Sequence, residues 1–121
     1  MNVEIPAELK KEVEKKGGWE KIKESLPEED IKMIAKVMKA LTDEKRLRIL
    51  YALYRQKMCV CMIADLVKCS YSKCSYHIAK LKGAGLIKAV KKGNYIIYSL
   101  TEFGKSIVRH FNKYKPEEVI K

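Results

Sequence analysis

Apolar residues recur every three or four positions along most of this chain, which is the spacing of amphipathic α-helices. The pattern predicts helices over residues 6–16, 19–25, 27–40, 43–55, 59–67, 70–83 and 102–115. We expect Thr42 and Ser70 to cap the helices over 43–55 and 70–83, because hydroxyl oxygens accept hydrogen bonds from the free N–H groups of a first turn.

The pattern changes after residue 85. Segments 86–91 and 95–100 are rich in β-branched and aromatic residues, and Gly93-Asn94 lies between them, which predicts a tight β-hairpin. The sequence therefore predicts a mainly α fold with a small β-hairpin, a winged helix-turn-helix. We assign this winged helix-turn-helix domain to residues 27–115, an N-terminal helical extension to 1–26 and a tail to 116–121.

The segment 70–83 has two distinct faces. Its apolar stripe falls at positions i, i+3, i+4 and i+7 and comprises Cys74, His77, Ile78 and Leu81, where His77 is expected to be a core histidine. The opposite face carries small or hydrogen-bonding side chains, flanked by Lys73 and Lys80. Such a face suits a helix in the major groove of DNA, where hydroxyl groups reach base edges and lysines reach phosphates.

Charge supports the same interpretation. The net charge is +11, but residues 1–30 hold nine acidic residues and six lysines, whereas residues 31–121 hold twenty basic and six acidic residues. No acidic residue occurs from Leu66 to Thr101, a stretch with seven lysines. This pattern predicts a polyanionic partner. The expected DNA-binding residues are Ser70, Tyr71, Ser72, Lys73, Ser75, Tyr76 and Lys80 of the helix and Lys91, Lys92, Asn94 and Tyr95 of the hairpin.

Three segments resemble the ArsR/SmtB family of repressors. They are VMKALTDEKRLRIL at 37–50, MCVCMIADL at 58–66 and SYSKCSYHIAKLKGAGL at 70–86. The resemblance implies a homodimer that binds an inverted-repeat operator in double-stranded DNA and is released by a metal, a metalloid or another inducer. No apolar run approaches the length of a membrane span or a signal peptide, so we expect a cytoplasmic protein. Wide apolar stripes in 27–41 and 102–115 favour these helices as the dimer interface. The N-terminal extension has no counterpart in the family.

Cys59 and Cys61 lie where the resemblance places the family's Cys-Val-Cys thiolates. Soft thiolates select As(III), Sb(III), Cd(II) or Zn(II), and no cofactor is otherwise required. Within a regular helix, side chains two positions apart point about 200° away from each other. Chelation by this pair is therefore expected to require a local distortion of the helix. The alternative is that one thiol faces the core and the other has no role.

Cys69 and Cys74 precede and follow the expected cap Ser70, at the two positions of a hydrophobic staple, where side chains touch. They are either a small apolar contact or a pair that closes a disulfide or shares a metal.

Other classes of function fit less well. The chain has no phosphate-binding loop, nucleophile elbow or metal-hydrolase motif, so we expect no enzyme activity. It also has no apolar run long enough to span a membrane. Two alternatives to a metal-responsive regulator remain open. One is a winged helix that binds DNA constitutively with inert cysteines, and the other is a thiol redox sensor.

Overall fold

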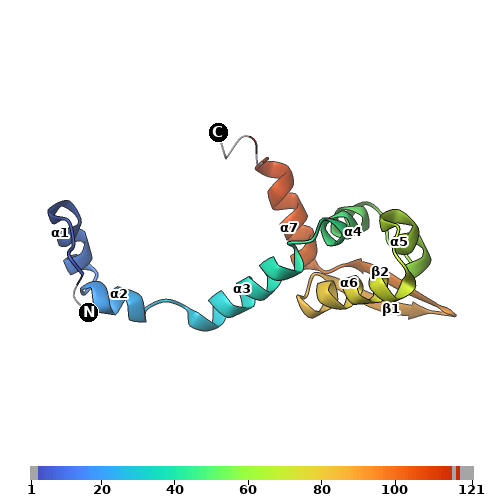
Figure 1. Ribbon diagram of the computed structural model, residues 1–121, viewed down its shortest axis with the longest axis horizontal. Coiled ribbons are helices and arrows are strands. Elements are labelled where there is room, and N and C mark those ends of the chain that lie inside the picture. The colour runs from blue at the N-terminus through green and yellow to red at the C-terminus, as the bar shows by residue number, and fades with distance from the viewer. Residues whose placement is uncertain (1–2, 116, 118–121) are drawn as a thin grey trace. The chain divides into compact units, whose positions relative to one another are not determined.

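The computed structural model describes residues 3–115 and 117, and it divides into two compact units, residues 1–33 and 34–121, which we describe separately. The mainly α fold with a small β-hairpin is confirmed (Figure 1). Most of the expected tail over 116–121 lies outside the described residues. The elements are α1 (Ala7–Lys15), α2 (Trp19–Glu24), α3 (Glu28–Ala40), α4 (Glu44–Arg55), α5 (Val60–Val67), α6 (Tyr71–Gly83), β1 (Ile87–Lys92), β2 (Tyr95–Leu100) and α7 (Glu102–Lys113).

The N-terminal unit contains α1, α2 and the start of α3. The helices predicted over 6–16 and 19–25 are present, and neither contains a buried residue. A salt bridge joins Lys23 Nζ to Glu20 Oε1 at 2.9 Å on the surface of α2, where such a pair contributes little stability. Large apolar side chains such as Leu9 and Trp19 stay exposed. Over residues 3–26, the extension therefore forms helices in which no side chain is buried.

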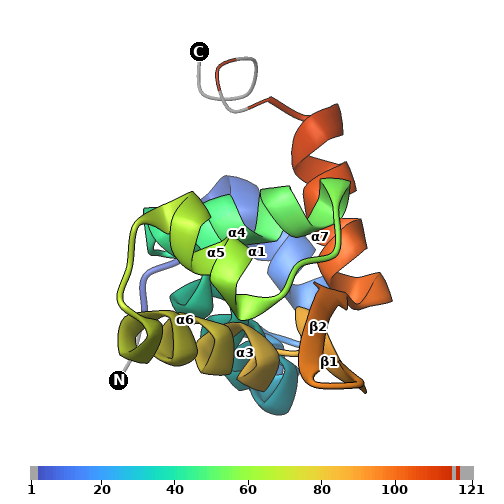
Figure 2. The same cartoon turned by 90° about the vertical axis from the view of Figure 1, so that its right-hand side faces the viewer.

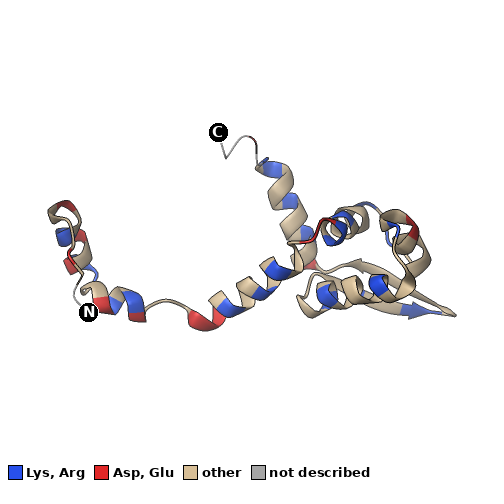
Figure 3. Ribbon diagram, in the orientation of Figure 1, with Lys and Arg blue, Asp and Glu red and all other residues tan. Residues whose placement is uncertain are grey.

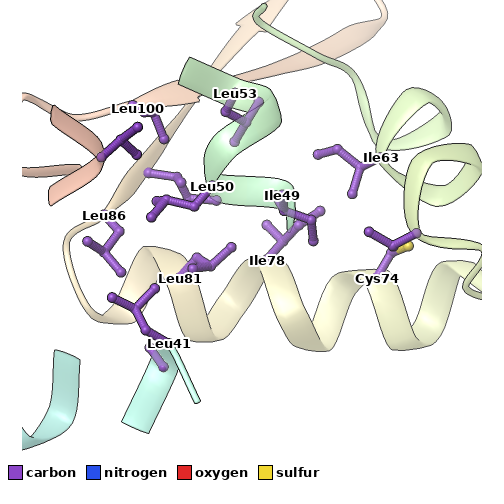
Figure 4. Packing of buried hydrophobic residues seen from close by; sticks show 14 residues of the cluster. Leu41, Ile49, Leu50, Leu53, Ile63, Cys74, Ile78, Leu81, Leu86 and Leu100 are labelled. Atoms are coloured by element: carbon purple, nitrogen blue, oxygen red, sulfur yellow. The ribbon is translucent and has the colours of Figure 1, made fainter. Parts of the chain in front are cut away.

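The core lies in the second unit, and every element of that unit contributes to it. Figure 2 shows α4, α5 and α6 stacked against one another, with the hairpin beside α7. Burial of each large aliphatic side chain contributes on the order of 1.5–3 kcal/mol. The buried apolar residues are Ala40, Leu41, Ile49, Leu50, Leu53, Ile63, Val67, Cys74, Ile78, Leu81, Leu86, Ile87, Leu100 and Val108 (Figure 4). None of the described helices is both long and apolar enough to cross a membrane.

The stripe predicted for α6 is confirmed. Cys74, Ile78 and Leu81 are buried, and His77 is 8% exposed. The Ser70 hydroxyl caps the helix as predicted, since it accepts a hydrogen bond from Lys73 N–H at 3.3 Å. The core therefore fixes which side of α6 faces solvent.

A buried guanidinium joins three helices. Arg46 of α4 donates from Nε to the carbonyl oxygen of Ala40, at the end of α3, over 2.6 Å. Its Nη1 lies 3.1 Å from His77 Nδ1 on α6. Arginine can only donate, so His77 accepts at Nδ1 and carries its proton on Nε2. Burial, with a smaller contribution from Arg46, lowers the pKa of His77 below its ordinary 6.5, which keeps the ring neutral at pH 7.

One predicted cap is wrong. The side chain of Asp43, not Thr42, caps α4, because its carboxylate accepts from both Lys45 N–H at 2.8 Å and Arg46 N–H at 3.1 Å. The Thr42 hydroxyl instead donates to the carbonyl oxygen of Lys39. A carboxylate is the stronger acceptor at the positive end of a helix dipole, which accounts for the difference.

The hairpin is the predicted one. β1 and β2 are antiparallel, with Lys92 opposite Tyr95 and Ile87 opposite Leu100, so Gly93 and Asn94 form a two-residue turn. Gly93 has a φ of 58° whereas Asn94 has no positive φ, which is the pattern of a type II′ turn. Only the base of the hairpin is buried, at Ile87 and Leu100. The turn therefore stands clear of the core.

A short β-bridge that the sequence pattern did not predict ties this hairpin to the loop before α5. Met58 N–H donates to the carbonyl oxygen of Tyr98 at 3.1 Å, and Tyr98 N–H donates back to Met58 at 2.7 Å. A single bridging residue has no periodicity, so it leaves no signal in the sequence.

Gly104 lets α7 approach the chain that enters β1. A Cβ at this buried position would overlap the carbonyl oxygen of Leu86 and lie 3.5 Å from Leu100 Cβ. The Thr101 hydroxyl donates a hydrogen bond to the carbonyl oxygen of Gly85, in the same segment, at 2.6 Å. The same hydroxyl caps α7, since it accepts a hydrogen bond from Gly104 N–H. The start of α7 is therefore anchored to the segment that follows α6.

We expect Gly104→Ala to destabilise the protein by about 1–3 kcal/mol, because the overlap outweighs the roughly 1 kcal/mol that alanine gains over glycine in a helix. The matched control is Gly83→Ala at the end of α6, where an added Cβ meets nothing within 4 Å. Urea unfolding should show the loss for Gly104→Ala only. Equal stability of the two variants would refute the close approach of α7.

Candidate nucleic-acid interface

The polar face of α6 is open to solvent. All seven residues predicted from this helix to bind DNA are exposed, and Tyr71 and Tyr76 are 62% and 56% exposed. The seven residues are Ser70, Tyr71, Ser72, Lys73, Ser75, Tyr76 and Lys80. Tyr71 is on the stripe of the buried Cys74 and Ile78, and it is exposed at the first turn of α6. Short hydroxyls, phenols and lysines of this helix are therefore all accessible to solvent.

The predicted hairpin residues lie at its tip. Lys91 and Lys92 end β1, Asn94 occupies the turn, and Tyr95 opens β2, and all four are exposed. Figure 3 shows basic residues along α6 and the hairpin, and neither element contains an acidic residue. The two elements lie beside each other in the fold (Figure 1). We call the exposed predicted residues of α6 and the hairpin together the basic surface.

Tyr76 of α6 lines two clefts. Its ring lies under Lys80 Nζ at 5.4 Å from the ring centroid, and Arg46 Cζ lies 6.0 Å from the same centroid. Cations over an aromatic face are attracted by its negative charge density. The two contacts hold the ring on the surface of α6, where the side chain remains 56% exposed.

The cleft on one side of Tyr76 extends the basic surface beyond what the sequence analysis predicted. Its volume is about 420 Å³, and its lining includes four basic residues and no acidic one: Lys36, Lys39, Arg46 and Lys80. Lys36 and Lys39 lie three positions apart on α3, a spacing that places them on one helix face and could have suggested this role. Their proximity to α6 depends on tertiary packing.

The cleft on the other side of Tyr76 has a volume of about 500 Å³. It is lined by Asp43, Lys45, Ser72, Lys73, Tyr76 and His77. Asp43 is the acidic residue in this lining, and its carboxylate is already engaged by the backbone N–H groups of α4, which lower its pKa. The predicted residues Ser72 and Lys73 therefore face a cleft with a basic rim.

Cys59 and Cys61 converge without the helix distortion that the sequence predicted. Their Sγ atoms lie 2.7 Å apart. The premise that both cysteines lie within the regular helix was wrong, because α5 begins at Val60 and Cys59 is its N-cap residue, with φ −86° and ψ 170°. Because the backbone of Cys59 is extended, its side chain does not take the direction that it would have inside a helix. The Cys59 thiol can therefore lie next to that of Cys61.

The electrostatics of this thiol pair favour one thiolate. The Cys61 thiol and the backbone N–H groups at the start of α5 lower the pKa of Cys59. The Cys59 sulfur in turn raises the pKa of Cys61. Cys59 is half-buried and Cys61 is exposed, so both are accessible to a soft ion. Among the residues that the structure describes, no group of three His, Cys, Asp or Glu side chains could enclose a metal.

The other two cysteines flank the cap of α6. Cys69 is half-buried, Cys74 is fully buried, and both carry free thiols. Lys45 Nζ donates to Cys69 Sγ at 3.3 Å, a contact between residues 24 positions apart that the sequence analysis missed.

Comparison with known proteins agrees with this geometry. The profile of the arsR family of bacterial regulatory proteins matches residues 43–89. A homolog of the cadmium resistance transcriptional regulatory protein CadC from Staphylococcus aureus is 36% identical over 81 residues, which is 66% of this chain and 67% of that protein. The arsenical resistance operon repressor of Bacillus subtilis is 43% identical over 65 residues, 53% of this chain and 62% of the repressor.

A solved structure agrees as well. The homodimeric winged helix-turn-helix DNA-binding domain of a possible ArsR-family transcriptional regulator from Mycobacterium bovis has a TM-score of 0.67 and 26% identity. The similarity covers 74% of this chain and 83% of that domain. Fold, exposed basic surface and relatives all agree, and the chain belongs to the ArsR family of winged-helix, DNA-binding transcriptional regulators.

Proposed function

We propose that this regulator is a cytoplasmic, homodimeric repressor that binds an inverted-repeat operator and leaves it when a thiophilic metal or metalloid ion binds Cys59 and Cys61. The observation that carries the proposal is the acid-free surface of α6 and the hairpin, combined with two convergent thiols at the start of the adjacent helix α5. The names of the cadmium- and arsenic-resistance relatives support the same class of inducer.

Each part of the basic surface has a role in DNA binding. Tyr71, Ser72, Ser75 and Tyr76 of α6 would face base edges in the major groove, where hydroxyl groups can both donate and accept. The hairpin would contact phosphates or the minor groove. The cleft beside Tyr76 would hold a backbone phosphate, because four cations line it without a carboxylate to oppose them.

Uncovered apolar side chains support a homodimer. Ile34 and Met38 of α3 and Phe103 and Phe111 of α7 are each 39–56% exposed. A second copy that covers them would bury apolar area that water otherwise contacts. Two-fold symmetry would then present two α6 helices to two half-sites of an inverted repeat. The homodimeric state of the similar Mycobacterium bovis domain agrees with this assembly.

The two thiols fit a soft ion because they converge and because the pKa of one is lowered. They would supply two ligands, with the remaining positions filled by solvent or the partner subunit. Cys59 directly follows Met58, whose backbone pairs with Tyr98 of β2. Cys59 also occupies the N-cap position of α5, which packs against α6. A change in the position of the Cys59 sulfur would thus act on both the hairpin and α6.

The DNA-binding role predicts distinct effects for two variants on a duplex selected by the wild-type protein from a random-sequence pool. We expect Tyr76→Ala to weaken binding to the selected duplex by about 1–3 kcal/mol, with a smaller effect on random DNA.

Lys92→Ala should weaken binding to both duplexes equally. It should also reduce the slope of log affinity against log salt concentration by about 1.

Fluorescence anisotropy at several salt concentrations measures both effects. The control is Tyr51→Ala, which removes an exposed tyrosine of α4 outside the basic surface and should leave affinity unchanged. If Tyr76→Ala discriminates between the selected and random duplexes as well as wild type does, α6 does not read the sequence through this face.

The sensing role predicts that As(III) or Cd(II) lowers the affinity of wild-type protein for the selected duplex by at least about tenfold, a coupling of about 1.4 kcal/mol or more. The double variant Cys59→Ser/Cys61→Ser should bind DNA as wild type does and lose this response. Cys69→Ser is the matched single-thiol control and should keep it. Equilibrium dialysis should find the ion bound to wild type and to Cys69→Ser only.

The remaining outcomes separate the alternatives. Affinity that no ion or oxidant changes would identify a constitutive DNA-binding protein with inert thiols. Affinity that responds to oxidant but not to metal would identify a redox sensor.

A further inference from the structure

A second thiol pair lies at the N-terminus of α6. Cys69 directly precedes the cap Ser70, and Cys74 follows one turn into the helix. Cys74 has no exposed surface and belongs to the core, where Figure 4 shows it on the core side of α6. Cys69 packs against the same core but is partly open to solvent. These are the two positions of a hydrophobic staple, whose side chains meet.

A positively charged side chain, that of Lys45, contacts one sulfur of this pair, which a purely apolar contact would not require. Its ammonium group reaches from the first turn of α4 and donates a hydrogen bond to Cys69 Sγ at 3.3 Å. A hydrogen-bonded cation stabilises the negative charge that a sulfur carries when it attacks an electrophile. The neighbouring Lys68 does not compete for the sulfur, since its ammonium lies 3.3 Å from the Asp65 carboxylate.

The two thiols differ in accessibility, as do the thiol that attacks an oxidant and the second thiol that then closes the disulfide. Cys69 is accessible and in contact with a cation, whereas Cys74 is enclosed. Burial, followed by the adjacent Cys69 sulfur, raises the pKa of Cys74, so this thiol stays protonated. An oxidant from solvent therefore meets Cys69 first, and Cys74 is held nearby for the second step.

We propose that Cys69 and Cys74 form an oxidant-reactive thiol pair, with Lys45 as its positioning cation, that a hydroperoxide converts to a disulfide across the N-terminus of α6. The Cys69 sulfur attacks one peroxide oxygen, the O–O bond breaks, and the leaving oxygen departs as water (or as an alcohol) after taking a proton. Cys69 is then a sulfenic acid. The Cys74 sulfur attacks the Cys69 sulfur, the S–S bond forms and the S–O bond breaks, which releases water. The two thiols supply the two electrons that reduce one peroxide.

This site goes beyond the proposed metal response, because it uses neither Cys59 nor Cys61. The disulfide would fix the first turn of the helix that carries Ser72 and Ser75. The chemistry can be tested without DNA or metal, so its failure is distinguishable from a failure of the proposed function.

The test uses full-length protein in the Cys59→Ser/Cys61→Ser background, which removes the other thiol pair. Stoichiometric hydrogen peroxide should form an intramolecular disulfide between Cys69 and Cys74, seen as the loss of two hydrogen atoms in the intact mass and as one cross-linked peptide. Lys45→Met should slow its formation about tenfold, the effect of one lost hydrogen bond from an ammonium group to the attacking sulfur. Lys45→Arg should retain most of the rate, and Lys68→Met is the control that should leave it unchanged.

A further variant identifies the nucleophile. With Cys74→Ala in the same background, Cys69 should remain a sulfenic acid that dimedone labels, and no disulfide should form. Far-ultraviolet circular dichroism verifies that each variant is folded. The proposal is overturned if Lys45→Met reacts at the rate of its parent, if dimedone labels no residue 69, or if both thiols stay reduced at peroxide concentrations that oxidise free cysteine.

Discussion

The position of α6, and with it the proposed DNA-binding surface, depends on the hydrogen bonds of the buried Arg46 side chain. A guanidinium removed from water is costly unless its N–H groups find acceptors. Here the acceptors are the carbonyl oxygen that ends α3 and the Nδ1 atom of His77 on α6. These partners fix α6 relative to α3 and α4, while the apolar stripe beneath α6 fixes its rotation. The same guanidinium lines the cleft beside Tyr76, so one charge serves both the packing of α6 and the positive surface around it.

The four cysteines bracket α5. Cys59 and Cys61 lie at its start, beside the backbone bridge from Met58 to the hairpin, and Cys69 and Cys74 follow its end, where α6 begins. Since α5 packs against α6, each pair is close to an element that would contact DNA. The pairs differ in chemistry: the first converges at an accessible helix terminus and suits a soft ion, and the second is a lysine-assisted nucleophile with a buried partner. A soft ion at the first pair and an oxidant at the second would therefore both act next to α6.

Local patterns in the sequence were sufficient to predict the helices, the hairpin turn at Gly93 and the buried and exposed faces of α6, because periodicity and turn chemistry depend on adjacent residues. Features that join distant segments were missed. The contact of Arg46 with His77 spans 31 positions, and the cleft of Lys36 and Lys39 is also lined by Lys80, which lies far from them in the sequence. Cys59 and Cys61 converge because α5 begins one residue later than predicted. Whether two cysteines can bind one ion thus depends on the backbone conformation of a single N-cap residue.

The most direct test of this protein as a symmetric winged-helix regulator is footprinting of wild-type protein on a duplex that it has selected from a random pool. Dimethyl sulfate and hydroxyl radicals together report major-groove and backbone protection. We expect two major-groove segments of related, inverted sequence, with centres about one helical turn, or roughly 10 base pairs, apart. Protection of a single segment, or of the backbone without the major groove, would contradict a dimer that reads DNA through α6.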